Sequence, residues 1–167
     1  MSIARRRKLV LSTHITFTVG WLGAVAAFLA LAVTGLSSRD PGVTGGVYRS
    51  MEATGWYVIV PLSLASLLTG LIQSLSTEWG LFRHYWILAT LLINVLAASV
   101  LLLFMRGLTG ADLLTPRPAG HAAAALVLLF TATVLSVYKP RGLTPYGSRK
   151  LRARRLQAEQ RREVPEG

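Results

Sequence analysis

Long stretches without a charged residue alternate with short polar segments along this chain. Four stretches contain no Asp, Glu, Lys or Arg, and they cover residues 9–38, 53–77, 84–105 and 118–138. Each is long enough to cross a hydrocarbon core of ~30 Å, which takes about 20 helical residues. Inside lipid every backbone N–H and C=O must be paired within the protein, so these stretches are expected to be helices. The pattern predicts an all-α polytopic membrane protein, a four-helix bundle with helices at about 9–37, 53–76, 84–105 and 118–138.

The charges are separated from this apolar interior. The chain has 167 residues, of which 52% are hydrophobic, and its 18 Lys and Arg against 7 Asp and Glu give a formal net charge of +11. The net charge is +4 for residues 1–8, +6 for residues 139–167 and +1 for everything between. We therefore divide the chain into a basic N-terminus (1–8), a transmembrane domain (9–138) and a basic tail (139–167).

The distribution of basic residues predicts the orientation. An even number of spans places both termini on the same side of the membrane. The two tails and the second loop hold 14 Lys and Arg, whereas the first and third loops hold four: Arg39, Arg49, Arg106 and Arg117. By the positive-inside rule both termini are expected to be cytoplasmic, in a bacterial plasma membrane. The first apolar stretch exceeds the 7–15 residues of a signal-peptide core, which favours an uncleaved anchor.

Several functional classes are excluded by what the sequence lacks. With no cysteine, the chain is neither a disulfide-stapled secreted domain nor a protein with a Cys-ligated zinc or iron–sulfur site. A nucleic-acid-binding protein is expected to carry its basic residues on a folded, partly polar domain, and here they lie in the tails. The sequence has no paired carboxylates, Ser/His/Asp set or phosphate loop. Because the loops are short, any chemistry is expected among the four helices.

Two histidines are candidates for that chemistry, because ionisable groups inside a membrane are costly. His14, Thr18 and Trp21 are spaced so that they share one face of the first helix, and His14 is expected near the cytoplasmic interface. His84 opens the third helix at the same boundary. Two imidazoles at similar depth on different helices are what axial ligation of a haem iron requires. His121 starts the fourth helix at the outer side, roughly 20 Å away, and is not expected to join them.

A structural interpretation of the polar residues also remains open. Histidines at helix ends often serve only as interfacial or capping groups, and the tryptophans Trp56, Trp79 and Trp86 fit an interfacial belt. The amides of Gln73 and Asn94 are expected to form hydrogen bonds between helices. Pairs of small residues that allow close helix packing are found at Gly20 and Ala24, Gly23 and Ala27, and Ser66 and Gly70.

The first helix resembles two known families. His14, followed after six residues by Trp21-Leu22-Gly23, looks like the H-x6-W-x-G pattern of the copper resistance D family. It is also similar to the His and Trp of the first helix in bacterial membrane protoporphyrinogen oxidases, which implies that His14 binds haem b, with Trp21 as a wall of the site. In these families a lysine often follows the third-helix Trp by four residues. That position is Thr90 here, so an oxidase-like mechanism is not carried over.

Residues of about 10–147 resemble a group of four-helix integral membrane proteins from high-GC bacteria, classified as a domain of unknown function. The segments that carry this likeness are 20–25 (GWLGAV), 80–86 (GLFRHYW) and 135–142 (LSVYKPRG). The resemblance implies the four-helix membrane fold and no particular activity.

Three functional hypotheses follow. The first is a haem-b or metal site near the cytoplasmic side, built on His14 with His84 as second ligand. The second is a non-catalytic assembly subunit that binds a second copy or another membrane protein through its small-residue helix faces. The third is copper handling or transport, for which the only sulfur ligands are Met1, Met51 and Met105. A visible absorption spectrum separates the first hypothesis from the others.

Overall fold

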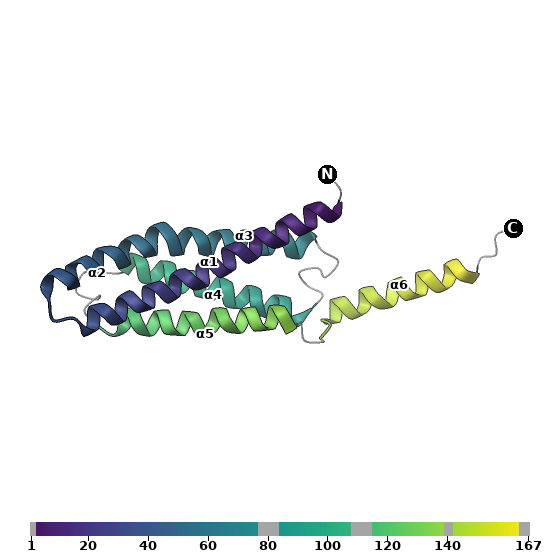
Figure 1. Cartoon of the computed structure of the whole chain (residues 1–167). Coiled ribbons are helices and arrows are strands. Elements are labelled where there is room, and N and C mark those ends of the chain that lie inside the picture. Colours follow the sequence, from purple (N-terminus) through teal and green to yellow (C-terminus); the bar gives the residue numbers. More distant parts are fainter. Residues whose placement is uncertain (1–2, 77–83, 108–114, 139–141, 164–167) are drawn as a thin grey trace.

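The computed structural model describes residues 3–76, 84–107, 115–138 and 142–163 and is helical almost throughout (Figure 1). One π-helical turn, η1 (Gly55–Ile59), joins the second and third of six α-helices. The α-helices are α1 (Ile3–Ser37), α2 (Pro41–Thr54), α3 (Val60–Ser76), α4 (Tyr85–Gly107), α5 (Arg117–Tyr138) and α6 (Pro145–Glu163). The described residues also contain an isolated antiparallel β-bridge between His84 and Leu143. The predicted all-α class is confirmed.

Four helical segments are long and apolar enough to cross a membrane, and they lie side by side as a bundle in Figure 1. They run over Arg7–Ser37, Pro41–Leu75, Tyr85–Gly107 and Arg117–Tyr138, so that α2, η1 and α3 together form the second span. The chain is a multi-pass membrane protein with the four-helix bundle that its charge-free stretches predict.

The helices extend further than the sequence pattern indicates. Helix α1 begins at Ile3 rather than near residue 9, because Arg and Lys are good helix formers. The stretch 38–52, expected to be a loop because of its glycines, is mostly helix α2. Asp40 caps this helix by accepting a hydrogen bond from Gly42 N at 2.8 Å, and Pro41 follows at the first helical position. An N-cap Asp followed by Pro is a helix-start signal that outweighs the glycines.

The second span contains a local change of helical pitch beside its proline. Val60 donates its N–H to Gly55 O, five residues back, which is the π pattern, and Pro61 follows with no N–H to donate. Ser63 is fully buried and donates to Val60 O at 2.8 Å. The sequence suggests that Ser63 repairs the carbonyl left without a partner by Pro61. The structure shows its hydroxyl on the Val60 carbonyl instead.

Helix α1 lies at the centre of the packing. Its buried residues recur every three or four positions, at Trp21, Val25, Phe28 and Ala32, and join one apolar cluster with residues of the other spans. Small residues of α4 and α5 belong to the same cluster, as expected for helices packed in lipid. These are Ala97 and Ala98 on α4 and Ala122 on α5. Many large apolar side chains point outward, as a bilayer requires.

Helix α6 extends away from the bundle beyond the end that holds the N-terminus (Figure 1). Its start is attached to the bundle, since Tyr85 N donates to Gly142 O at 3.3 Å and Thr144 is buried. Thr144 Oγ1 accepts a hydrogen bond from Gly147 N at 3.1 Å, which caps the helix. The described side chains from Arg149 onward are exposed. The basic tail is therefore largely a helix that the bundle does not cover.

Candidate histidine site between the first and second spans

His14 faces helix α3. Its Nδ1 lies 3.1 Å from Thr69 Oγ1, and its ring packs against Gly70. A Cβ at position 70 would lie 3.0 Å from His14 Cε1, closer than nearly all real Cβ contacts. Glycine at this position therefore lets the imidazole lie directly on the backbone of α3, with one ring nitrogen held by Thr69.

A second contact between hydroxyls joins the same two helices one turn further along. Thr18 Oγ1 lies 2.9 Å from Ser66 Oγ, and Ser66 is buried. We call the four residues His14, Thr18, Ser66 and Thr69 the polar seam. Because His14 and Thr18 are four residues apart on α1, and Ser66 and Thr69 three apart on α3, each pair lies on the face directed at the other helix.

The hydrogen bonds within the seam determine which ring nitrogen of His14 carries the proton. Thr69 Oγ1 lies only 2.7 Å from Ala65 O, and since a carbonyl only accepts, the single hydroxyl hydrogen of Thr69 is donated there. Thr69 can then only accept from His14, so His14 Nδ1 carries a hydrogen. In the neutral ring the lone pair is consequently on Nε2.

The second contact follows the same logic. Thr18 Oγ1 donates to His14 O at 2.9 Å, so Ser66 is the donor in the contact between the two hydroxyls. Every hydroxyl hydrogen of the seam thus has an acceptor. A histidine whose Nδ1–H is anchored by an oxygen and whose Nε2 lone pair remains is in the form in which metal-ligating histidines are held.

Gln73 adds an acceptor to the same face of α3. It follows Ser66, Thr69 and Gly70 at helical spacing, one turn beyond Thr69. Its Oε1 is buried and has no hydrogen-bond partner among the described residues. The interhelical hydrogen bond expected of Gln73 is therefore not formed at Oε1. A buried acceptor without a partner requires an explanation, and a ligand or ion at the seam is one.

His84 lies at the same end of the bundle but outside the seam. It stands immediately before α4, in the bridge with Leu143, with its ring centroid 6.4 Å from that of Trp86. His14 is level with Thr69, seven residues before the end of α3 at Ser76, which corresponds to about 10 Å along the axis. The structure thus places both histidines at one end of the bundle, His14 on α1 and His84 just before α4. His14 lies deeper, so the two are not at the similar depth that the sequence predicts.

Trp21 is a residue of the hydrophobic core. It is 1% exposed and belongs to the central apolar cluster. The cavity that it lines holds His121 of α5 rather than His14. His121 lies at the opposite end of the bundle, where its Nδ1 is 2.8 Å from Arg117 O and its ring stacks on Phe104. The expectation that His121 is remote from His14 agrees with this placement.

The described residues contain no group of three His, Cys, Asp or Glu side chains that could hold a metal ion. Met51 and Met105 are buried in the half of the bundle remote from His14, where Met105 packs on Gly55. Met1 and Trp79 lie outside the described residues. Within the described part of the chain, sulfur ligands therefore do not join His14, which leaves the copper hypothesis without a soft donor set.

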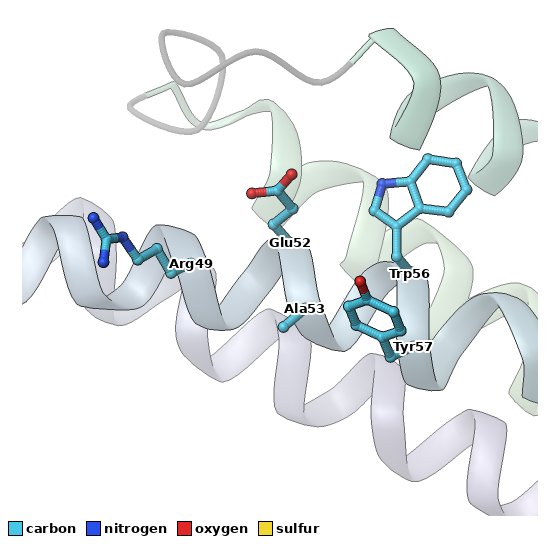
Figure 2. Close-up of a pocket in the computed structure, with 5 residues that line it drawn as sticks. All are labelled: Arg49, Glu52, Ala53, Trp56 and Tyr57. Atoms are coloured by element: carbon cyan, nitrogen blue, oxygen red, sulfur yellow. The ribbon is translucent and has the colours of Figure 1, made fainter.

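A groove on α2 and η1 was not predicted from the sequence. Figure 2 shows Glu52 and Trp56 projecting on the same side of the helix, with Arg49 one turn away and Tyr57 beside Trp56. Trp56 is 39% exposed and Tyr57 82% exposed, in keeping with the interfacial role expected of Trp56. The signal that reveals this groove is the Asp40-Pro41 helix start, because only a helix places Arg49, Glu52 and Trp56 on one face.

No protein-family model, curated protein or solved structure matches this chain.

Proposed function

We propose that this chain is an integral protein of the bacterial plasma membrane that binds haem b or a metal ion through His14, near the cytoplasmic side. The observation that supports this function is the anchored imidazole. Thr69 accepts from Nδ1, Gly70 lets the ring lie against the backbone of α3, and Nε2 keeps its lone pair. Haem b bound there would supply one-electron chemistry within the membrane.

Two further residues fit this proposal. Gln73 Oε1, buried without a partner on the same face of α3, offers an oxygen to a metal ion or accepts a hydrogen bond from a ligand. His84, at the same end of the bundle immediately before α4, is the proposed second ligand. Ligands on α1 and just before α4 would hold the group from two separate parts of the bundle.

The test is the visible spectrum of the full chain in nanodiscs, recorded after loading with haem b. The wild type is expected to show a Soret band, and His14→Ala is expected to abolish it. His84→Ala is expected to shift the band, because the proposed second ligand would be lost while His14 remains. His121→Ala is the matched control, since His121 is at the other end of the bundle, and its spectrum should equal that of the wild type.

Two results would overturn the proposal. One is a wild-type protein that shows no Soret band after haem loading and retains no metal in elemental analysis after loading with iron, copper or zinc. The other is a spectrum or metal content that His14→Ala leaves unchanged. Either result would assign the polar seam to helix packing alone.

A non-catalytic partner subunit is the second candidate function, and the outer face of α1 favours it. Gly20 packs on Leu62, but a Cβ added at Gly23 would meet nothing within 4 Å. Exposed small residues continue along the same face at Ala26, Ala27 and Ala30. Such a face allows close approach of another membrane helix, from a second copy or from another protein. We expect Gly23→Leu to abolish co-purification of that partner, with Gly120→Leu on α5 as control.

A further inference from the structure

An apolar cavity of about 170 Å³ lies between α1, α4 and α5, in the half of the bundle remote from His14. Trp21 and Phe28, both buried, line it from α1. Leu96 and Val100 of α4 also line it, and they are 53% and 44% exposed. The cavity therefore extends from the core to the surface that faces lipid.

The size and lining of the cavity suit one small ring. An engineered cavity of about 150 Å³ lined by Leu, Ile and Phe stays dry and binds benzene. The cavity here is slightly larger, and its lining is apolar apart from His121. Because its open side faces the hydrocarbon of the bilayer, an occupant would enter from the membrane.

His121 supplies a hydrogen-bond acceptor to the lining. Its Nδ1 lies 2.8 Å from Arg117 O, and since a carbonyl only accepts, Nδ1 carries the hydrogen. Nε2 of the neutral ring is therefore an acceptor. The ring is held by stacking on Phe104, with centroids 4.7 Å apart and an interplanar angle of 24°. His121 is exposed, and an occupant of the cavity that brings a hydrogen-bond donor can bind Nε2 in place of solvent.

We propose that this cavity binds one hydroxylated aromatic ring from the bilayer, of the phenol or hydroquinone class, with its hydroxyl donating to His121 Nε2. The ring fills the volume beside Trp21 and Phe28, and any alkyl substituent leaves between α4 and α5. An acyl chain would fill the same volume without using the imidazole acceptor. The site is separate from the polar seam, so its test does not depend on the proposed function.

The test uses Trp21 as its own reporter. In the full chain, Trp56→Phe, Trp79→Phe and Trp86→Phe leave Trp21 as the single tryptophan. Its fluorescence in nanodiscs is recorded during titration with phenol, and with benzene as the probe that lacks the hydroxyl. Saturable quenching is expected with both probes, and phenol is expected to bind about five-fold more tightly because of its one hydrogen bond.

Variants separate the hydroxyl contact from the cavity. His121→Phe keeps an aromatic ring on Phe104 but removes the acceptor. The affinity for phenol should therefore fall to that for benzene, and the affinity for benzene should not change. Tyr138→Phe, which removes a polar group from an exposed ring of α5 outside the lining, is the control and should alter neither affinity. Leu128→Phe narrows the opening from the lipid side and should abolish saturation by both probes. Ala124→Leu, also at the opening, repeats this test if Leu128→Phe does not fold.

Three outcomes would overturn the proposal. If quenching of Trp21 rises linearly with probe concentration when the cavity residues are unchanged, the probes only partition into the bilayer. Saturation that survives both Leu128→Phe and Ala124→Leu would place the binding elsewhere. Equal affinities for phenol and benzene, unaffected by His121→Phe, would remove the role of the hydroxyl and of His121.

Discussion

The hydroxyl groups of the spans behave in two ways. Thr34 donates to the carbonyl four residues back in its own helix, as does Thr131, and both are exposed to the lipid side. This bond gives the hydroxyl hydrogen an acceptor within the helix, so that it is not left unpaired in hydrocarbon. Thr18 and Thr69 make the same kind of bond and in addition turn a lone pair toward the facing helix. Both side chains thereby accept hydrogen bonds from polar groups of the neighbouring span, Thr69 from His14 and Thr18 from Ser66.

Removal of the acceptor at position 69 tests the polar seam directly. Thr69→Val keeps the shape of the side chain but leaves His14 Nδ1–H without its oxygen. We expect the free energy of unfolding in detergent to fall by about 0.6 kcal/mol, with ~1.7 kcal/mol as the upper end known for such bonds. The measurement is equilibrium unfolding by denaturing detergent. Thr131→Val, whose hydroxyl bonds only within α5, is the control and should change little.

The tautomer of His14 gives an independent readout of the same contact. Nitrogen NMR of the wild type should show a proton on Nδ1, and in Thr69→Val that preference should be lost. Equal stabilities for the two threonine variants, together with an unchanged tautomer, would mean that the seam does not orient the imidazole.

Helical spacing in the sequence predicts the α1 side of the polar seam but not its α3 side. The shared face of His14, Thr18 and Trp21 follows from their positions within one helix. The partners Thr69 and Gly70 depend on how α1 and α3 slide and rotate against each other, which no single-helix period contains. The same limit explains Trp21, predicted as a wall of the histidine site and found in the core, because a position seven residues on lies about 10 Å further along the helix.

At the scale of elements, the demands of lipid made the four spans predictable. Backbone groups in hydrocarbon must pair within the helix, so long uncharged stretches leave few alternatives. Outside the spans no such demand applies, and local signals compete. The glycines of residues 41–54 indicated a loop, but the Asp40 cap and Pro41 begin helix α2 there. The π-helical turn η1 likewise depends on backbone packing around Pro61.

Helix α6 offers a test of which elements stabilise the bundle. The described side chains from Arg149 onward are exposed, so truncation after Ser148 should change the free energy of unfolding by less than about 0.5 kcal/mol. Truncation after Tyr138 also removes the partner of the His84 bridge and the buried Thr144, and should lower stability clearly. Thermal unfolding in nanodiscs measures both. A large loss of stability on truncation after Ser148 would show that α6 packs on the bundle.

At the scale of the whole molecule, most of each span faces outward. Between 17% and 28% of the most apolar window of each span is buried inside the protein. Sites that could carry function are correspondingly few in the described residues. The polar seam and the apolar cavity lie in opposite halves of the bundle and share no residue. They can therefore be altered independently, which allows each proposal to be tested without disturbing the other.

The orientation of the molecule can be tested because the chain contains no cysteine. Four spans place α6 on the side where α1 begins, and the excess of basic residues predicts that this side is cytoplasmic. Gln157→Cys on α6 and Ser37→Cys at the far end of α1 are both exposed positions. In intact cells a membrane-impermeant maleimide should label Ser37→Cys only, and Gln157→Cys should react after permeabilisation. Val127→Cys, exposed toward lipid on α5, is the control and should resist labelling in both conditions. The reverse pattern would invert the topology and place His14 near the outer surface, whereas labelling of both sites in intact cells would mean that the number of spans is odd.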